Sequence, residues 1–170
     1  MSKTRFVAGA RAAVFATVTF GMITAAQADP TRDALEKFGL LGTWAADCKQ
    51  KPSGRNPWQT YRIASSGKPT RVLTMKDGSL DGTFAMTNVK LMAPDRLAYR
   101  DTRTTGTLYF DVVLVRRNDR VRSVSSVSSD GKVLIRDGKF VDSGAPTLEF
   151  ERCPVRQTSG RTGVSGPGAA

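Results

Sequence analysis

Turn-forming residues recur about every dozen positions after residue 40, and this spacing constrains the fold more than any other feature of the sequence. Short segments rich in β-branched and aromatic residues lie between the turns. The Asp-Gly pairs at 77–78, 130–131 and 137–138 are typical of two-residue hairpin turns, because both turn positions tolerate a positive φ. The pattern predicts strands at 41–47, 58–65, 70–76, 83–91, 96–103, 107–116, 120–128, 132–136, 139–141 and 147–152.

Several predicted strands have one apolar and one mixed face. In the segment 107–116, one face carries Leu108, Phe110, Val112 and Leu114. Such one-sided patterning is typical of a sheet whose other face meets water. A curled sheet of many such strands closes more readily than it stays open. We therefore predict an all-β, antiparallel up-and-down barrel of about 8–9 strands. Another antiparallel barrel or a sandwich is the alternative.

One short helix is predicted before the first strand, at 31–38. Thr31 or Asp29 can cap its N-terminus, and Gly39 falls where a left-handed C-cap residue is expected. Leu35 and Phe38 share one face of this helix, which would dock on the strands that follow.

The N-terminal segment has the three zones of a secretory signal peptide: Lys3 and Arg5, an apolar run at 12–25, and Ala26-Gln27-Ala28. The run is shorter than the roughly 20 residues of a transmembrane anchor, which is the alternative. The predicted organisation is a cleavable signal peptide at 1–28, a single β-barrel domain at 29–156 and a disordered tail at 157–170. We expect a periplasmic or secreted protein without a membrane span.

The two cysteines, Cys48 and Cys153, lie near the start and the end of the predicted domain. In an exported protein such a pair predicts a disulfide bond. Two reduced, buried thiols are the alternative.

The sequence contains no histidine. This excludes Ser-His-Asp and Cys-His catalysis and the usual zinc sites. Acidic residues recur in the predicted turns, where side-chain hydrogen bonds to the backbone account for them; examples are Asp77, Asp95, Asp119, Asp130 and Asp137. We therefore expect no enzymatic activity, no cofactor and no metal site.

The net charge is strongly positive. Three of the 26 basic residues lie in the predicted signal peptide, so that 23 remain against 15 acidic residues, a net charge of +8. The densest basic cluster, at 116–122, is predicted to be a solvated hairpin tip; an anion-binding patch is the alternative.

Gly42-Thr43-Trp44 follows the predicted helix at the start of the first strand. This G-x-W sequence resembles the signature of the lipocalins and of the wider calycin group, which includes the avidins. The resemblance implies an eight-stranded barrel in which Trp44 packs at the closed end. It also implies a basic residue across the Trp44 ring, at Arg152 or otherwise Arg156, because a guanidinium over an indole is a favourable pair.

The predicted disulfide and the predicted eight-stranded barrel require different registers between the first and last strands. Antiparallel first and last strands would set Cys48 opposite the beginning of the last strand, whereas Cys153 follows its end. Either the last strand is shifted past Cys48, or an odd strand count makes the two strands parallel, with Trp44 level with Glu149.

A barrel of this kind implies a small-molecule carrier with its ligand in the barrel mouth. Its predicted ligand-binding residues are Trp58, Tyr61, Phe84, Met86, Tyr99 and Phe110. The loop at 49–57 would overhang the mouth. Alternatively, the inward side chains fill the barrel completely.

We predict an exported, non-catalytic, monomeric protein of the periplasm that binds a small hydrophobic molecule and no nucleic acid. The alternative is an envelope interaction or inhibitor domain that binds a macromolecular or anionic partner through surface loops.

Overall fold

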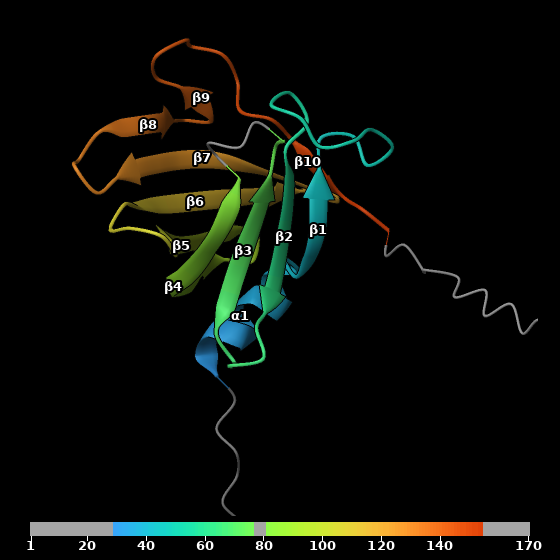
Figure 1. Cartoon of the computed structure of the whole chain (residues 1–170), viewed down its shortest axis with the longest axis vertical. Coiled ribbons are helices and arrows are strands. Elements are labelled where there is room, and N and C mark those ends of the chain that lie inside the picture. Colours follow the sequence, from blue (N-terminus) through green and yellow to red (C-terminus); the bar gives the residue numbers. More distant parts are fainter. Residues whose placement is uncertain (1–28, 77–80, 155–170) are drawn as a thin grey trace, which may run out of the picture.

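The computed structural model describes residues 29–76 and 81–154, which form one helix and ten strands (Figure 1). The elements are α1 (Pro30–Phe38), β1 (Gly42–Ala45), β2 (Trp58–Ile63), β3 (Pro69–Thr74), β4 (Gly82–Ala93), β5 (Arg96–Arg103), β6 (Tyr109–Arg117), β7 (Arg120–Ser128), β8 (Val133–Arg136), β9 (Lys139–Phe140) and β10 (Phe150–Arg152). The predicted signal peptide, the predicted tail, the Asp77-Gly78 turn and Arg156 lie outside the described residues.

Eight strands, β1 to β7 and β10, form a closed antiparallel barrel. Consecutive strands pair from β1 to β7, and β10 completes the ring because it pairs antiparallel with both β1 and β7. In Figure 1, β1–β3 run roughly upright and β6 and β7 run across them. The predicted up-and-down barrel with a short N-terminal helix is confirmed.

The remaining strands, β8 and β9, extend from the barrel wall beside β10. The first residues of β7, Arg120 and Val121, pair with β10, whereas Ser126 and Val127 near its end pair with β8. The β8–β9 turn at Asp137-Gly138 has positive φ at both positions, 51° and 73°, as the sequence predicts. At the Asp130-Gly131 turn only Gly131 has a positive φ.

Each predicted strand is present; the bounds of β5 and β7 are as predicted, and those of the other strands are shifted. The strand predicted at 147–152 is shorter: β10 begins at Phe150, and the Thr147 backbone N–H donates to the Gly138 carbonyl oxygen at 2.9 Å. Leu108 precedes β6 and is exposed, so its predicted place on the apolar face of that strand is wrong.

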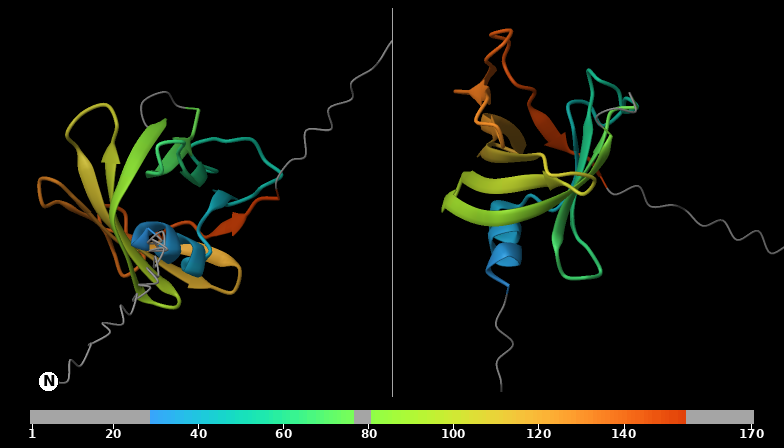
Figure 2. Two further views of the ribbon diagram at one scale, coloured as in Figure 1. Left: turned by 90° about the horizontal axis from the view of Figure 1, so that it is seen from below. Right: turned by 60° about the vertical axis from the view of Figure 1, so that its left-hand side comes forward.

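The helix α1 closes one end of the barrel (Figure 2). Asp29 caps it by accepting a hydrogen bond from the Thr31 backbone N–H at 2.9 Å, and Gly39 ends it in the left-handed conformation at φ 73°. Its buried face packs against apolar side chains that point inward from the strands. The fully or nearly buried residues of this end include Leu35, Phe38, Leu40, Trp44, Leu97, Leu114, Val121 and Phe150.

Trp44 lies in this closed end, as the G-x-W resemblance implies. It is 2% exposed, and its indole N–H donates to the Leu40 carbonyl oxygen at 2.7 Å. Arg152 is its cross-strand partner in β10, but the Arg152 guanidinium donates to the Leu41 carbonyl oxygen. The arginine-over-ring contacts among the described residues are at Phe84, Tyr109 and Phe38, so the implied Arg152–Trp44 stacking is not among them.

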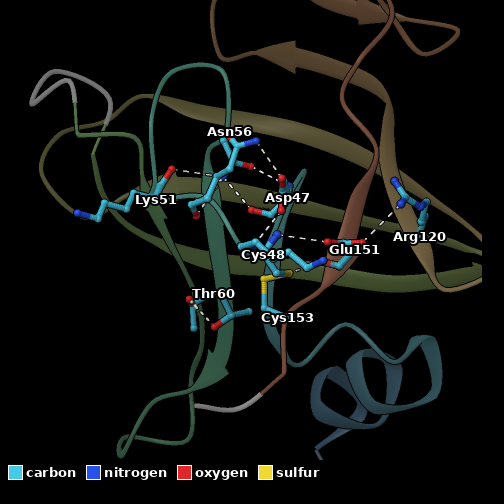
Figure 3. Close-up of a disulfide and its surroundings, with 11 residues drawn as sticks. Asp47, Cys48, Lys51, Asn56, Thr60, Arg120, Glu151 and Cys153 are labelled. Carbon is cyan, nitrogen blue, oxygen red and sulfur yellow. Dashed lines mark hydrogen bonds and ion pairs between the residues drawn. A yellow bond between two sulfur atoms is a disulfide. The ribbon is translucent and has the colours of Figure 1, made fainter.

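Cys48 and Cys153 form the predicted disulfide, with their Cα atoms 5.3 Å apart. Both expected registers are wrong, because β1 and β10 are antiparallel and Trp44 lies opposite Arg152. After Ala45 the chain turns back, so that Cys48 returns to β10 and its N–H donates to the Glu151 carboxylate at 3.2 Å (Figure 3). A turn outside the strand therefore reconciles the disulfide with an even strand count.

Asn56 holds this turn in shape from within the loop. Its side chain accepts from the Asp47 N–H at 2.9 Å and donates to the Asp47 carbonyl oxygen at 2.9 Å (Figure 3). Asn56 is buried, and its amide also donates to the carbonyl oxygens of Gln50 and Lys51. The loop at 47–56 is thereby tied to the disulfide.

Ion pairs join β7 to the segment that closes the barrel. Arg120 lies 3.5 Å from the Glu151 carboxylate, and Arg122 lies 3.7 Å from that of Glu149. Two arginines of the basic cluster at 116–122 are thus paired, and Arg116 lies over the Phe38 ring at 5.7 Å. These contacts account for part of the cluster without a bound anion.

Replacing both cysteines by serine should lower the free energy of unfolding by about 2–5 kcal/mol, because the disulfide restricts the unfolded chain over a long loop. Urea unfolding of C48S/C153S against the parent protein measures this, with Lys49→Ser as a control in the same loop. An unchanged unfolding midpoint, or two free thiols in the denatured, unreduced parent, would contradict the assignment.

Candidate functional site

The inner face of the barrel becomes polar away from α1. Directly paired residues of neighbouring strands lie on the same face of a sheet. Arg71 of β3 pairs with Tyr61 and Phe84, and Asp101 of β5 pairs with Met86 and Phe110. Because Tyr61, Phe84 and Met86 are buried inside the barrel, Arg71 and Asp101 must point inward as well.

A cavity of about 150 Å³ lies beside these two residues. Its polar walls are Gln59, Arg71, Tyr99, Asp101, Ser123 and Ser126. Its apolar walls are Phe110, Val112 and Ile135. The walls come from inward-facing residues of β2, β3 and β5 to β7 and from Ile135 of β8, so the cavity lies within the barrel and opens to its outside.

Arg71 and Asp101 form an ion pair at the cavity. The Arg71 Nε donates to Asp101 Oδ2 at 2.9 Å, and Nη2 donates to the same oxygen. The Asp101 side chain is 1% exposed and that of Arg71 is 12% exposed. The guanidinium also lies over the Phe84 ring, 4.4 Å from its centroid. This is a nearly dry ion pair inside the barrel.

Three further polar groups complete the cluster. Gln59 Oε1 accepts hydrogen bonds from the Tyr61 hydroxyl at 2.8 Å and from Arg71 Nη1 at 3.3 Å. The hydroxyls of Tyr61 and Tyr99 lie 3.5 Å apart. Arg71 is thus held from two sides, by the carboxylate and by the amide oxygen.

Burial governs the protonation of the cluster. It raises the pKa of Asp101 above its ordinary value, while the Arg71 guanidinium opposes that rise. It also raises the pKa of Tyr61 and, more strongly, of Tyr99. Burial works against the charge on Arg71, but the Asp101 carboxylate and both tyrosines raise the pKa of the guanidinium overall. Arg71 therefore stays charged and both tyrosines stay neutral.

One oxygen of the cluster is left without a partner. Asp101 Oδ1 is buried and accepts no hydrogen bond from any described residue, because both contacts from Arg71 go to Oδ2. A buried acceptor without a partner costs about 1–3 kcal/mol, and more when it is charged. A residue that lines the cavity thus contains an unused hydrogen-bond acceptor.

Five of the six predicted ligand-binding residues point into the barrel, and two of them, Tyr99 and Phe110, line the cavity. Tyr61, Phe84, Met86, Tyr99 and Phe110 lie on inner faces of barrel strands. Trp58 lies elsewhere, in a hollow of about 320 Å³ beside the disulfide that also includes Gly42 and Arg152. Among the described residues, the loop at 49–57 contributes nothing to the cavity wall.

Sequence reasoning missed Arg71, Asp101 and Gln59. Asp101 lies two positions after Tyr99 in the same strand, and residues two apart in a strand share a face. The inward assignment of Tyr99 therefore contained the signal for Asp101. The partner was not visible in the same way, because Arg71 lies in another strand.

Another hollow lies on the outer face of the sheet. It measures about 580 Å³, and Val113, Val124, Val127 and Val133 line it together with Arg96 and Arg136. Asp137 is the one acidic residue among the described residues that line it. This surface is positively charged and partly apolar.

The described residues contain no group of three or more His, Cys, Asp or Glu side chains that could hold a metal ion. No helix among them has the length and apolar character needed to cross a membrane.

No protein-family model, curated protein or solved structure matches this chain. The eight-stranded antiparallel barrel with one short helix is compatible with a lipocalin-like barrel, and the compatibility is one of fold.

Replacing both Arg71 and Asp101 by apolar residues should leave the stability of the fold nearly unchanged, whereas replacing only one of them should lower it. Arg71→Met should lower the free energy of unfolding by about 3–5 kcal/mol, because it leaves a buried charge unpaired, whereas R71M/D101L should be close to neutral. Urea unfolding measures both variants.

The exposed pair Arg100–Asp111, 2.8 Å apart on the outer face, is the matched control. Its R100M/D111L variant and its single variants should each change stability by about 1 kcal/mol or less. A double inner variant as unstable as Arg71→Met would contradict the account.

Proposed function

We propose that this protein is an exported, non-catalytic binding protein that holds a small molecule inside the barrel. The buried Arg71–Asp101 pair at the cavity carries the proposal. A buried ion pair is weak support for stability, because apolar residues of similar volume replace it at little or no cost. A role in ligand recognition would explain why the Arg71–Asp101 ion pair is present in the barrel.

The chemistry of the walls bears on the kind of ligand. Six of the nine lining residues carry polar side chains, and two of these are charged. A purely hydrophobic ligand would leave the Asp101 oxygen unsatisfied. The ligand we propose therefore has at least one polar group, in place of the hydrophobic molecule predicted from sequence.

The lipocalin-like character and the export route belong to the same proposal. A closed barrel with a G-x-W sequence and a helix across one end supports a carrier with its ligand in the lumen. The disulfide is compatible with an oxidising compartment such as the periplasm. The absence of histidine from the sequence supports binding without catalysis.

A second candidate is binding of an anionic partner at the outer hollow. Arg96 and Arg136 flank its valine floor, and an adjoining hollow adds Arg117 and Arg122. Charge of this kind attracts polyanions in a salt-dependent manner.

Two neighbouring serines of β7 distinguish the candidates. Ser126 lines the inner cavity and Ser125 lines the outer hollow. If the lumen binds the ligand, native mass spectrometry of protein purified from the periplasm should show a small-molecule adduct that Ser126→Leu loses and Ser125→Leu keeps, because only the first substitution fills the cavity.

The outer-surface candidate gives the reverse result. The parent protein would carry no adduct but would bind immobilised heparin in a salt-sensitive manner, and Ser125→Leu would weaken that binding while Ser126→Leu would not. That combination contradicts the proposed function.

A further inference from the structure

In the residues that line the cavity, the Arg71 donors already have partners, whereas one Asp101 acceptor has none among the described residues. This difference bears on the class of ligand. The inference rests on the proposed function, because it concerns the same cavity. Both Nε and Nη2 of Arg71 donate to Asp101 Oδ2, and Nη1 donates to Gln59 Oε1. Asp101 Oδ1 accepts nothing from the described residues. The strongest unused group at the cavity is thus an acceptor.

The charges at the cavity cancel. The Arg71 guanidinium is neutralised by Asp101 at close range, and no other ionised side chain lines the cavity within the described part of the chain. An anionic ligand would have to approach Asp101, and a cationic ligand would have to approach Arg71. Either one would bring an unpaired charge into a nearly dry site, at a cost of several kcal/mol.

The size of the cavity limits the ligand as well. A volume of about 150 Å³ corresponds to about five water molecules in the liquid. It lies below the roughly 300–1,000 Å³ of pockets for drug-sized molecules. An apolar cavity of about this volume holds a benzene-sized molecule. Phe110, Val112 and Ile135 provide an apolar surface against which the carbon part of such a molecule can lie.

We propose that the barrel selects small uncharged molecules that donate an N–H or O–H hydrogen bond to Asp101 Oδ1 and place an apolar part against Phe110, Val112 and Ile135. Ser123 and Ser126, which line the same cavity, add polar side chains to its wall.

Two pairs of probes test the proposal on the unmodified protein by ligand-detected NMR. Phenol and fluorobenzene are nearly isosteric and differ in the O–H donor. Benzyl alcohol and benzylammonium both donate and differ in charge. We expect phenol to bind about tenfold to a hundredfold more tightly than fluorobenzene, the value of one hydrogen bond to a charged group. Benzyl alcohol should bind more tightly than benzylammonium by at least about tenfold.

The variant Asp101→Asn tests the role of the carboxylate directly. It keeps the size of the side chain but leaves Arg71 without its counter-charge. The preference should therefore shift, with phenol losing affinity and benzoate gaining at least about tenfold. Ser125→Leu, on the outer face, should leave all affinities unchanged. If Asp101→Asn does not fold, the two probe pairs on the parent protein decide the question alone.

The outcomes separate this inference from the proposed function. Equal binding of phenol and fluorobenzene, lost in Ser126→Leu, overturns the donor requirement and supports a small-molecule lumen. Tighter binding of benzylammonium, or of benzoate by the parent protein, overturns the requirement for an uncharged ligand. Absence of binding by every probe, together with absence of a co-purified molecule, overturns both.

Discussion

The pairing of three residues, Phe150–Arg152, with two strands at once is the interaction on which the structure depends. β10 meets β1 on one side and β7 on the other, and among the described strands it alone joins the two sides of the sheet into a ring. So short a strand forms few ladder hydrogen bonds, and the chain adds the Cys48–Cys153 disulfide and the Arg120–Glu151 ion pair at the same place. Without this closure the inner faces would be one side of an open, twisted sheet.

Closure of the barrel also buries the Arg71–Asp101 pair away from water. On an open sheet this pair would be hydrated, as Arg100–Asp111 is on the outer face, and would contribute little. Inside the barrel a buried ion pair lowers stability unless each of its polar atoms has a hydrogen-bond partner, and Asp101 Oδ1 has none among the described residues. The helix and the apolar side chains around Trp44 fill one end of the interior, so the polar residues and the cavity are confined to the rest.

Local sequence patterns predicted the helix and the strands, but they did not predict contacts between residues of different strands. Turn residues and alternation placed all ten strands, because turn chemistry and side-chain period are properties of neighbouring residues. The Asp29 and Gly39 caps followed for the same reason. The return of the chain between Ala45 and Cys48 could not be predicted, because it depends on a contact with Glu151, 103 positions from Cys48, as well as on Asn56 within the loop. Arg71 and Asp101 likewise meet only after the register across β3, β4 and β5 is known.

A crystal structure of the protein purified directly from the periplasm of producing cells tests the central claim most directly. The account predicts electron density for a small molecule in the cavity between Arg71 and Ser126, with a nitrogen or oxygen about 2.6–3.2 Å from Asp101 Oδ1. A cavity filled by side chains, or one that holds only ordered water in every crystal form, would contradict it.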